Sequence, residues 1–200
     1  MIQIQTSAQD ALTAALQALQ AGQVVGYPSE TVWGLAVLPG HPEALERLYQ
    51  RKGRDPLKPV QLSCQDAELA REWVAPDQPL FERLTAWWPG PLTLLARARP
   101  GCPPDLAPDG VVGLRVPDHP LAQALLQAAG GVLVTTSLNP SGAPPAVRAA
   151  QAQQYGLADL LFGIEDDVGT VAGLASTVID TRSGVVVRRG SLLPPLPELR

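Results

Sequence analysis

Val132-Leu-Val-Thr-Thr-Ser137 is the clearest buried strand in this sequence, a short β-branched run that ends in hydroxyl side chains. A helical pattern over 120–129 comes before it, and Gly130-Gly131 separates the two. Asn139-Pro-Ser-Gly142 follows the strand and is typical of a sharp turn. This order of helix, strand and polar turn predicts an α/β fold with polar loops at the strand ends.

The chain on either side repeats this mixture of strands and helices. Further strands are predicted at 23–27, 60–64, 92–96, 111–116, 160–163, 176–180 and 185–189. Further helices are predicted from the capping-box-like Ser7–Asp10 to Gly22 and at 42–50, 66–73, 78–87 and 148–154, with Asp118 capping the helix at 120 and a loop over 28–35. The alternation is not strictly βαβ, so we expect a twisted, open, mixed α/β sheet in one domain, residues 1–190, with a loose Pro-rich tail over 191–200.

Composition narrows the class of protein. Hydrophobic residues make up 46% of the 200 residues and charged residues 17%, which is enough for a sizeable core. The formal charge of −4 argues against a surface built as a whole to hold nucleic acid. Cys64 and Cys102 are far apart and form no zinc or disulfide pattern. We find neither a signal peptide nor an apolar run of ~20 residues and therefore expect a soluble, cytoplasmic protein that does not enter a membrane.

A basic cluster stands out in this acidic chain. Its five members lie within twelve positions: Arg47, Arg51, Lys52, Arg54 and Lys58. One interpretation is a helix C-terminus, where cations offset the helix dipole and Gly53 caps the last turn. The other is a site for a specific anion. The spacing of these residues alone does not decide between the two.

Several kinds of chemistry are excluded by missing motifs. The sequence has no phosphate-binding loop, no dinucleotide-binding glycine pattern and no His-Glu-x-x-His. His41 and His119 each precede a proline at a helix start and are read as local residues, and Ser137 lacks the Gly-x-Ser-x-Gly elbow of a hydrolase. What remains is catalysis by cations and backbone amides that position reactants and neutralise charge. The candidates lie mostly at strand ends, where open α/β sheets bind ligands: Lys52, Arg54, Lys58, Arg115, Ser137, Asn139 and Arg188.

Seven short motifs occur in a fixed order along the chain. They are Pro28-Ser-Glu-Thr-Val-Trp-Gly-Leu35, Lys52-Gly-Arg54, Gly90-Pro-Leu-Thr93, Leu114-Arg-Val-Pro-Asp-His119, Ser137-Leu-Asn139-Pro-Ser-Gly142, Ser176-Thr-Val-Ile-Asp180 and Arg188. This ordered set resembles the YrdC/TsaC family of threonylcarbamoyl-AMP synthases, in its short form, from about Gln23 to Gly190. The resemblance implies a YrdC-like twisted sheet (the dsRBD-like α/β twist) around a basic groove. It also implies an enzyme that turns L-threonine, bicarbonate and ATP into threonylcarbamoyl-AMP and pyrophosphate, which separate transferase proteins use to modify tRNA.

The resemblance further implies roles for individual residues. Catalytic charge stabilisation falls to Lys52 and Arg54; ATP binding to Arg54, Lys58, Val111, Asn139 and Arg188; threonine binding to Thr31, Arg115, Ser137 and Ser176. Mg²⁺ is expected on the phosphates, although the sequence contains no metal-ligand motif. These roles suit a carbamate that attacks the α-phosphate of another anion, a step that needs charge neutralisation and alignment rather than a side-chain nucleophile.

Four positions depart from the family pattern, and two other functions compete. Ser29 and Trp33 replace the usual Thr and Tyr, Ser63 stands where many relatives have His, and Val147 where they have Ser or Thr. One alternative is an RNA-binding accessory module that has weak, salt-dependent affinity for RNA and no turnover. The other is the carbamoyl-transfer domain of hydrogenase-maturation proteins. Those chains add an acylphosphatase unit and zinc-finger cysteines, and neither is seen in this sequence.

Overall fold

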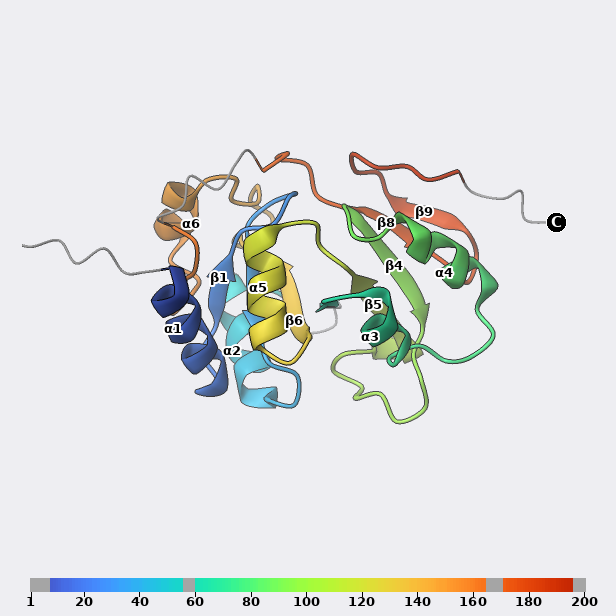
Figure 1. The fold of residues 1–200 in the computed structure, drawn as a ribbon, viewed down its shortest axis with the longest axis horizontal. Coiled ribbons are helices and arrows are strands. Elements are labelled where there is room, and N and C mark those ends of the chain that lie inside the picture. Colours follow the sequence, from blue (N-terminus) through green and yellow to red (C-terminus); the bar gives the residue numbers. More distant parts are fainter. Residues whose placement is uncertain (1–7, 56–59, 165–170, 196–200) are drawn as a thin grey trace, which may run out of the picture.

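The computed structural model describes residues 8–55, 60–164 and 171–195. In this part of the chain nine strands form one sheet in the order β7-β1-β2-β6-β3-β5-β4-β8-β9 (Figure 1). The strands are β1 Val25–Tyr27, β2 Gly34–Val37, β3 Gln61–Cys64, β4 Leu92–Arg97, β5 Val111–Arg115, β6 Val132–Ser137, β7 Leu160–Leu161, β8 Thr177–Asp180 and β9 Val185–Arg188. β1–β7, β3–β5 and β4–β8 are parallel pairs and the others are antiparallel, which confirms the predicted mixed sheet.

Six α-helices and two short 3₁₀ helices accompany the sheet in the described residues. They are α1 Ala8–Gln20, α2 Pro42–Lys52, α3 Ala67–Arg71, α4 Pro79–Leu84, α5 Pro120–Ala128 and α6 Ala149–Tyr155, with 3₁₀ turns at Thr85–Trp87 and Pro108–Gly110. Figure 1 shows α1, α2 and α5 beside β1 and β6, and α3 and α4 beside β4 and β5. No helix in the described ranges is long and apolar enough to cross a membrane.

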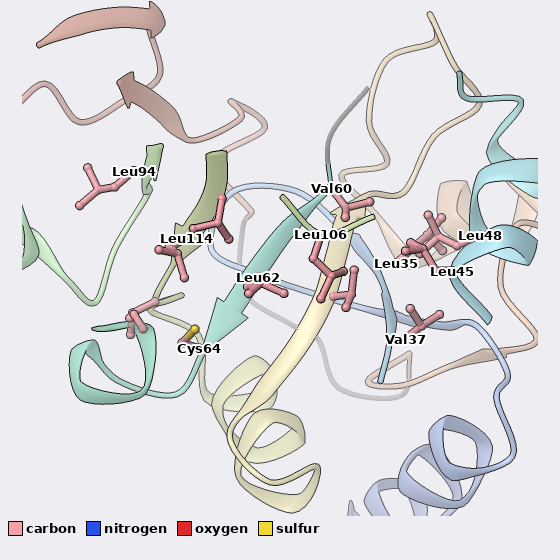
Figure 2. Close-up of a cluster of buried hydrophobic side chains, with 14 of the residues drawn as sticks. Leu35, Val37, Leu45, Leu48, Val60, Leu62, Cys64, Leu94, Leu106 and Leu114 are labelled. Carbon is pink, nitrogen blue, oxygen red and sulfur yellow. The ribbon is translucent and has the colours of Figure 1, made fainter. Parts of the chain in front are cut away.

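The two faces of the sheet are covered differently. One buried cluster joins the core-facing side chains of β3, β4 and β5 to helices α2, α3 and α4; it includes Leu45, Leu48, Leu62, Leu94 and Leu114 (Figure 2). A second cluster packs α1 and α5 against the opposite side of β1, β2 and β6, through Val25, Ala36 and Leu133. Side chains alternate along a strand, so the residues next to the core-facing ones in β3, β4 and β5 lie on this second face. There they line a cleft: Gln61, Thr93, Gly113 and Arg115.

The C-terminus of α2 has the predicted glycine cap. Gly53 has φ 60° and ψ 37°, the left-handed conformation that favours glycine. Its N–H donates to Gln50 O at 3.1 Å, and Arg54 N–H donates to Tyr49 O at 3.0 Å. The cap turns the chain sharply at the point where the basic cluster leaves the helix, so the cap interpretation holds at the C-terminus of α2 and does not conflict with an anion site further on.

Three local predictions differ from the structure. The predicted loop over 28–35 ends in strand β2, which sequence periodicity missed because it is only four residues long, begins with glycine and is buried throughout. β2 pairs with β6, from Gly34 opposite Ser137 to Val37 opposite Val134. This pairing stabilises the strand, which local sequence propensity alone does not predict. Asp118 does not cap α5, because the N-cap is His119, which makes no side-chain capping bond. In the predicted tail, the described Leu192 packs against the core.

Candidate active site

The cleft has a volume of about 520 Å³ and lies across the central strands on the face that α5 leaves open. Three arginines line it: Arg54, Arg115 and Arg188. Thr31, Ser137 and Ser176 also belong to its wall, and no Asp or Glu is found among its described lining residues. Six of the residues predicted from the sequence are thus brought together in one concave, cationic site.

Arg115 lies at the centre of the cleft, at the end of β5. Its Nη2 donates to Glu30 Oε1 at 2.7 Å and to Thr31 Oγ1 at 2.9 Å. The Arg115 side chain is only 7% exposed, and its Nε has no partner in the described structure, nor does Glu30 Oε2. A buried donor without a partner is costly. Nε is sealed off by the packing, whereas Nη1 is not and has no partner in the described structure, so Nη1 is the donor that an anionic ligand could take up.

A second set of hydroxyl groups lies beside Arg115. Tyr27 and Thr135 line the cleft, and Ser63 is buried next to them. Ser63 pairs with Arg115 in the sheet, and its Oγ lies 2.8 Å from Thr135 Oγ1. Both hydroxyls hydrogen-bond to Tyr27, and burial raises the pKa of the Tyr27 phenol, which keeps it neutral. The Tyr27 ring lies across Gly34, where a Cβ would come within 2.8 Å of Tyr27 Cε1. Ser63, one of the departures from the family pattern, is therefore part of a satisfied polar cluster.

The other end of the cleft is formed by β9 and the segment before β8. Arg188 Nε donates to Ser176 O at 2.9 Å, and Arg188 Nη2 donates to Ser176 Oγ at 3.1 Å. Burial lowers the pKa of Arg188, and the nearby charge of Arg115 lowers it further. Arg115 is buried and Arg188 is more exposed, and two guanidinium groups close enough to repel one another are a favourable place for an anion.

Lys52 lies behind the cleft wall rather than in it. It is 2% exposed, and its Nζ donates to Ser137 O at 2.6 Å, Asn139 Oδ1 at 2.8 Å and Asn139 O at 2.9 Å. These three contacts use the three hydrogens of the ammonium group. Burial and the charge of Arg54 lower the pKa of Lys52 to about 8, so it still carries its proton at neutral pH. Lys52 thus holds the turn that carries Ser137.

The remaining predicted residues stand further from the cleft centre. Asn139 is buried in the turn, where its Nδ2 donates to Ala143 O at 2.7 Å. Val111 begins β5 on the same face as Gly113 and Arg115 but is not a lining residue. Lys58 lies outside the described residues.

Two features of the site were missed by the sequence reasoning. Glu30 is the ion-pair partner of Arg115. It lies in the motif Pro28–Leu35, but the resemblance assigns it no function. Gln61 lines the cleft, and only the polar–apolar alternation of its strand could have pointed to it. The side chain of Trp33, another departure, is fully buried, and its Nε1 has no partner in the described structure.

A protein site for Mg²⁺ does not follow from these residues. Within the described ranges no group of three His, Cys, Asp or Glu side chains lies close enough to hold a metal ion. The cleft wall offers hydroxyls and arginines, whereas Mg²⁺ prefers carboxylate oxygens. The described residues therefore do not form a resident metal centre.

Comparison with known proteins gives consistent results. The model of the Sua5/YciO/YrdC family, described as "telomere recombination", matches residues 17–190. The chain is 40% identical over 177 residues to a threonylcarbamoyl-AMP synthase of Alkalilimnicola ehrlichii, an alignment that covers 85% of this chain and 90% of that protein.

Two solved structures share the fold. Sua5 of P. abyssi, complexed with L-threonine, superposes with a TM-score of 0.84 at 27% identity, over 93% of this chain and 55% of that chain. YciO of E. coli superposes with a TM-score of 0.80 at 24% identity, over 92% of this chain and 91% of that chain. The second likeness concerns the fold alone.

Proposed function

The chain belongs to the Sua5/YciO/YrdC family, and on that basis we propose that it is a threonylcarbamoyl-AMP synthase. It converts L-threonine, bicarbonate and ATP into threonylcarbamoyl-AMP and pyrophosphate. The observation that carries the proposal is the convergence of Arg54, Arg115 and Arg188 on a cleft whose described lining contains no carboxylate. Such a site suits a reaction whose participants are a carboxylate, bicarbonate and a triphosphate, all of them anions.

The chemistry needs no side-chain nucleophile. The amine of threonine attacks bicarbonate and forms a carbamate with loss of water. A carbamate oxygen then forms a bond to the α-phosphorus of ATP, and the bond to pyrophosphate breaks. The protein contributes alignment and positive charge, which offsets the repulsion between the two anions and the charge that develops on the leaving pyrophosphate.

Threonine occupies the part of the cleft around Arg115. The guanidinium group meets the substrate carboxylate through Nη1, because Nη2 is held by Glu30 and Thr31 and Nε is buried by the packing. The Thr31 hydroxyl donates a hydrogen bond to Ser29 Oγ, because the Ser29 hydroxyl already donates its hydrogen to Val32 O at 2.7 Å. Ser137 and Ser176, on the two sides of the cleft, complete the threonine site.

ATP spans the cleft from the end of α2, where Arg54 lies, to β9, where Arg188 lies. Arg54 faces its phosphates, with Lys58 as a further cation, while Arg188, Asn139 and the backbone near Val111 hold the nucleotide. Of these residues, Arg54 and Arg188 line the cleft. Lys52 supports catalysis as a positioning residue that fixes the turn from Ser137 to Asn139. Mg²⁺ accompanies the ATP phosphates as part of the substrate.

The product serves separate transferase proteins that modify tRNA, and residues 1–190 form the unit that makes it. The test incubates the protein with ATP, labelled bicarbonate and single amino acids, and follows pyrophosphate. Release that depends on threonine is expected. RNA binding that weakens with salt, without any nucleotide turnover, would instead support the accessory-module alternative.

A further inference from the structure

Four polar side chains form a continuous chain of hydrogen bonds along the floor of the cleft. Arg188 Nη2 donates to Ser176 Oγ at 3.1 Å, and Ser176 Oγ lies 2.8 Å from Thr93 Oγ1. Thr93 Oγ1 in turn donates to Gln61 Oε1 at 3.1 Å. Gln61 on β3 reaches Thr93 on β4 across β5, because the β5 residue that pairs with Gln61 is Gly113, which has no side chain.

The direction of each hydrogen bond follows from the two ends of this chain. A guanidinium group can only donate and an amide oxygen can only accept. Thr93 gives its single hydroxyl hydrogen to Gln61 Oε1, so the hydroxyl hydrogen of Ser176 goes to Thr93. If the amide were turned over, the hydroxyl hydrogen of Ser176 would have no acceptor among its described neighbours. The network therefore fixes the Gln61 amide with its oxygen toward Thr93.

This orientation leaves the amide nitrogen of Gln61 as a donor that faces the cleft. Gln61 is half-buried and lines the cleft, and its Nε2 has no hydrogen-bond partner within the described part of the chain. Nε2 is also not one of the polar atoms that the packing seals off. A cation at the far end polarises each hydroxyl in turn and then the amide, which strengthens its N–H groups as donors.

We propose that Gln61 binds an anionic oxygen on the threonine-derived substrate, either the carboxylate of threonine or the carbamate formed from it. The inference rests on the proposed function and adds a residue to its site. Thr93, which orients Gln61, pairs with Arg115 in the sheet, so Gln61 lies near the part of the cleft in which we place threonine. The described lining contains no carboxylate that could accept from Nε2, so the acceptor comes with the ligand.

The test compares two variants with the wild-type protein. Gln61→Leu removes the donor at similar size, and Gln61→Glu replaces it with a group that repels an anion. We expect threonine affinity, or the KM for bicarbonate, to weaken about ten-fold in Gln61→Leu and more in Gln61→Glu, because a hydrogen bond to a charged group is lost. Calorimetry with threonine alone reports on the carboxylate, and a change confined to bicarbonate KM reports on the carbamate; either result supports the proposal.

Gln20→Glu is the matched control, because Gln20 is exposed at the end of α1 and the variant adds the same charge away from the cleft. It should behave as wild type. Unchanged threonine affinity and bicarbonate KM in a folded Gln61→Leu would overturn the proposal, as would an effect confined to ATP. If the wild-type protein releases no pyrophosphate with threonine, the proposed function fails instead, and that result comes before any variant is compared.

Discussion

Arg115→Gln removes the cation that we place against the threonine carboxylate, and its effect follows from the contacts in the cleft. Nη2 of Arg115 is occupied by Glu30 and Thr31 and Nε is buried by the packing, so Nη1 remains for the ligand. A hydrogen bond to a charged group contributes about 1.5–3 kcal/mol, so losing the Nη1 contact costs about 1.5–3 kcal/mol of binding free energy. That corresponds to roughly 10- to 150-fold weaker threonine binding.

The assay measures the dissociation constant of threonine by calorimetry and the KM for ATP by pyrophosphate release. We expect a large change in the first and a change of about two-fold or less in the second. Arg115→Lys should fall between wild type and Arg115→Gln, because one ammonium cannot replace the planar fork. Arg182→Gln is the control, since it breaks an arginine–carboxylate pair with Asp180 away from the cleft lining. Threonine affinity within two-fold of wild type in a folded Arg115→Gln would refute the assignment.

Three further predictions concern the end of α2. Because burial and the charge of Arg54 lower the pKa of Lys52 to about 8, the ammonium loses its proton as the pH rises through that value and then has one donor fewer for the Ser137 turn. Activity should fall above that pH, and Lys52→Arg should move the fall to higher pH; identical pH profiles would contradict the positioning role. Arg54→Ala should lower turnover ~10²-fold without changing the binding of threonine alone, as loss of preorganised charge does elsewhere; near-normal turnover in pyrophosphate assays removes Arg54 from the mechanism. Gly53→Ala should lower the free energy of unfolding in urea by about 1–2 kcal/mol, because φ at this position is 60°; an unchanged midpoint would argue against the cap.

The parts of the fold that sequence predicted well are those where local signals agree with tertiary structure. β6 was expected from its β-branched run, and the end of α2 from Gly53. The mixed α/β fold and the family resemblance are confirmed, the second by the family match over residues 17–190 and by the curated relatives. β2 was missed because its formation depends on pairing with β6, which no local pattern reports.

The site was predictable as a set of residues but not in its internal arrangement. Arg54, Arg115 and Arg188, which the motifs pointed to, line one cleft, as expected for binding residues beyond strand ends. The position of Lys52 behind the wall depends on how α2 packs against the turn after β6. The role we infer for Gln61 depends on its pairing with Gly113 on the neighbouring strand. This pairing is set by the register of the two strands, which cannot be predicted from spacing along the chain.

The most direct test of the proposed function is the formation of threonylcarbamoyl-AMP by the purified protein from ATP, labelled bicarbonate and L-threonine, followed by chromatography of the labelled product. We predict one labelled adenylate that appears with an equal amount of pyrophosphate and only when threonine is present. No such product, or the same product with other amino acids and without threonine, would contradict it.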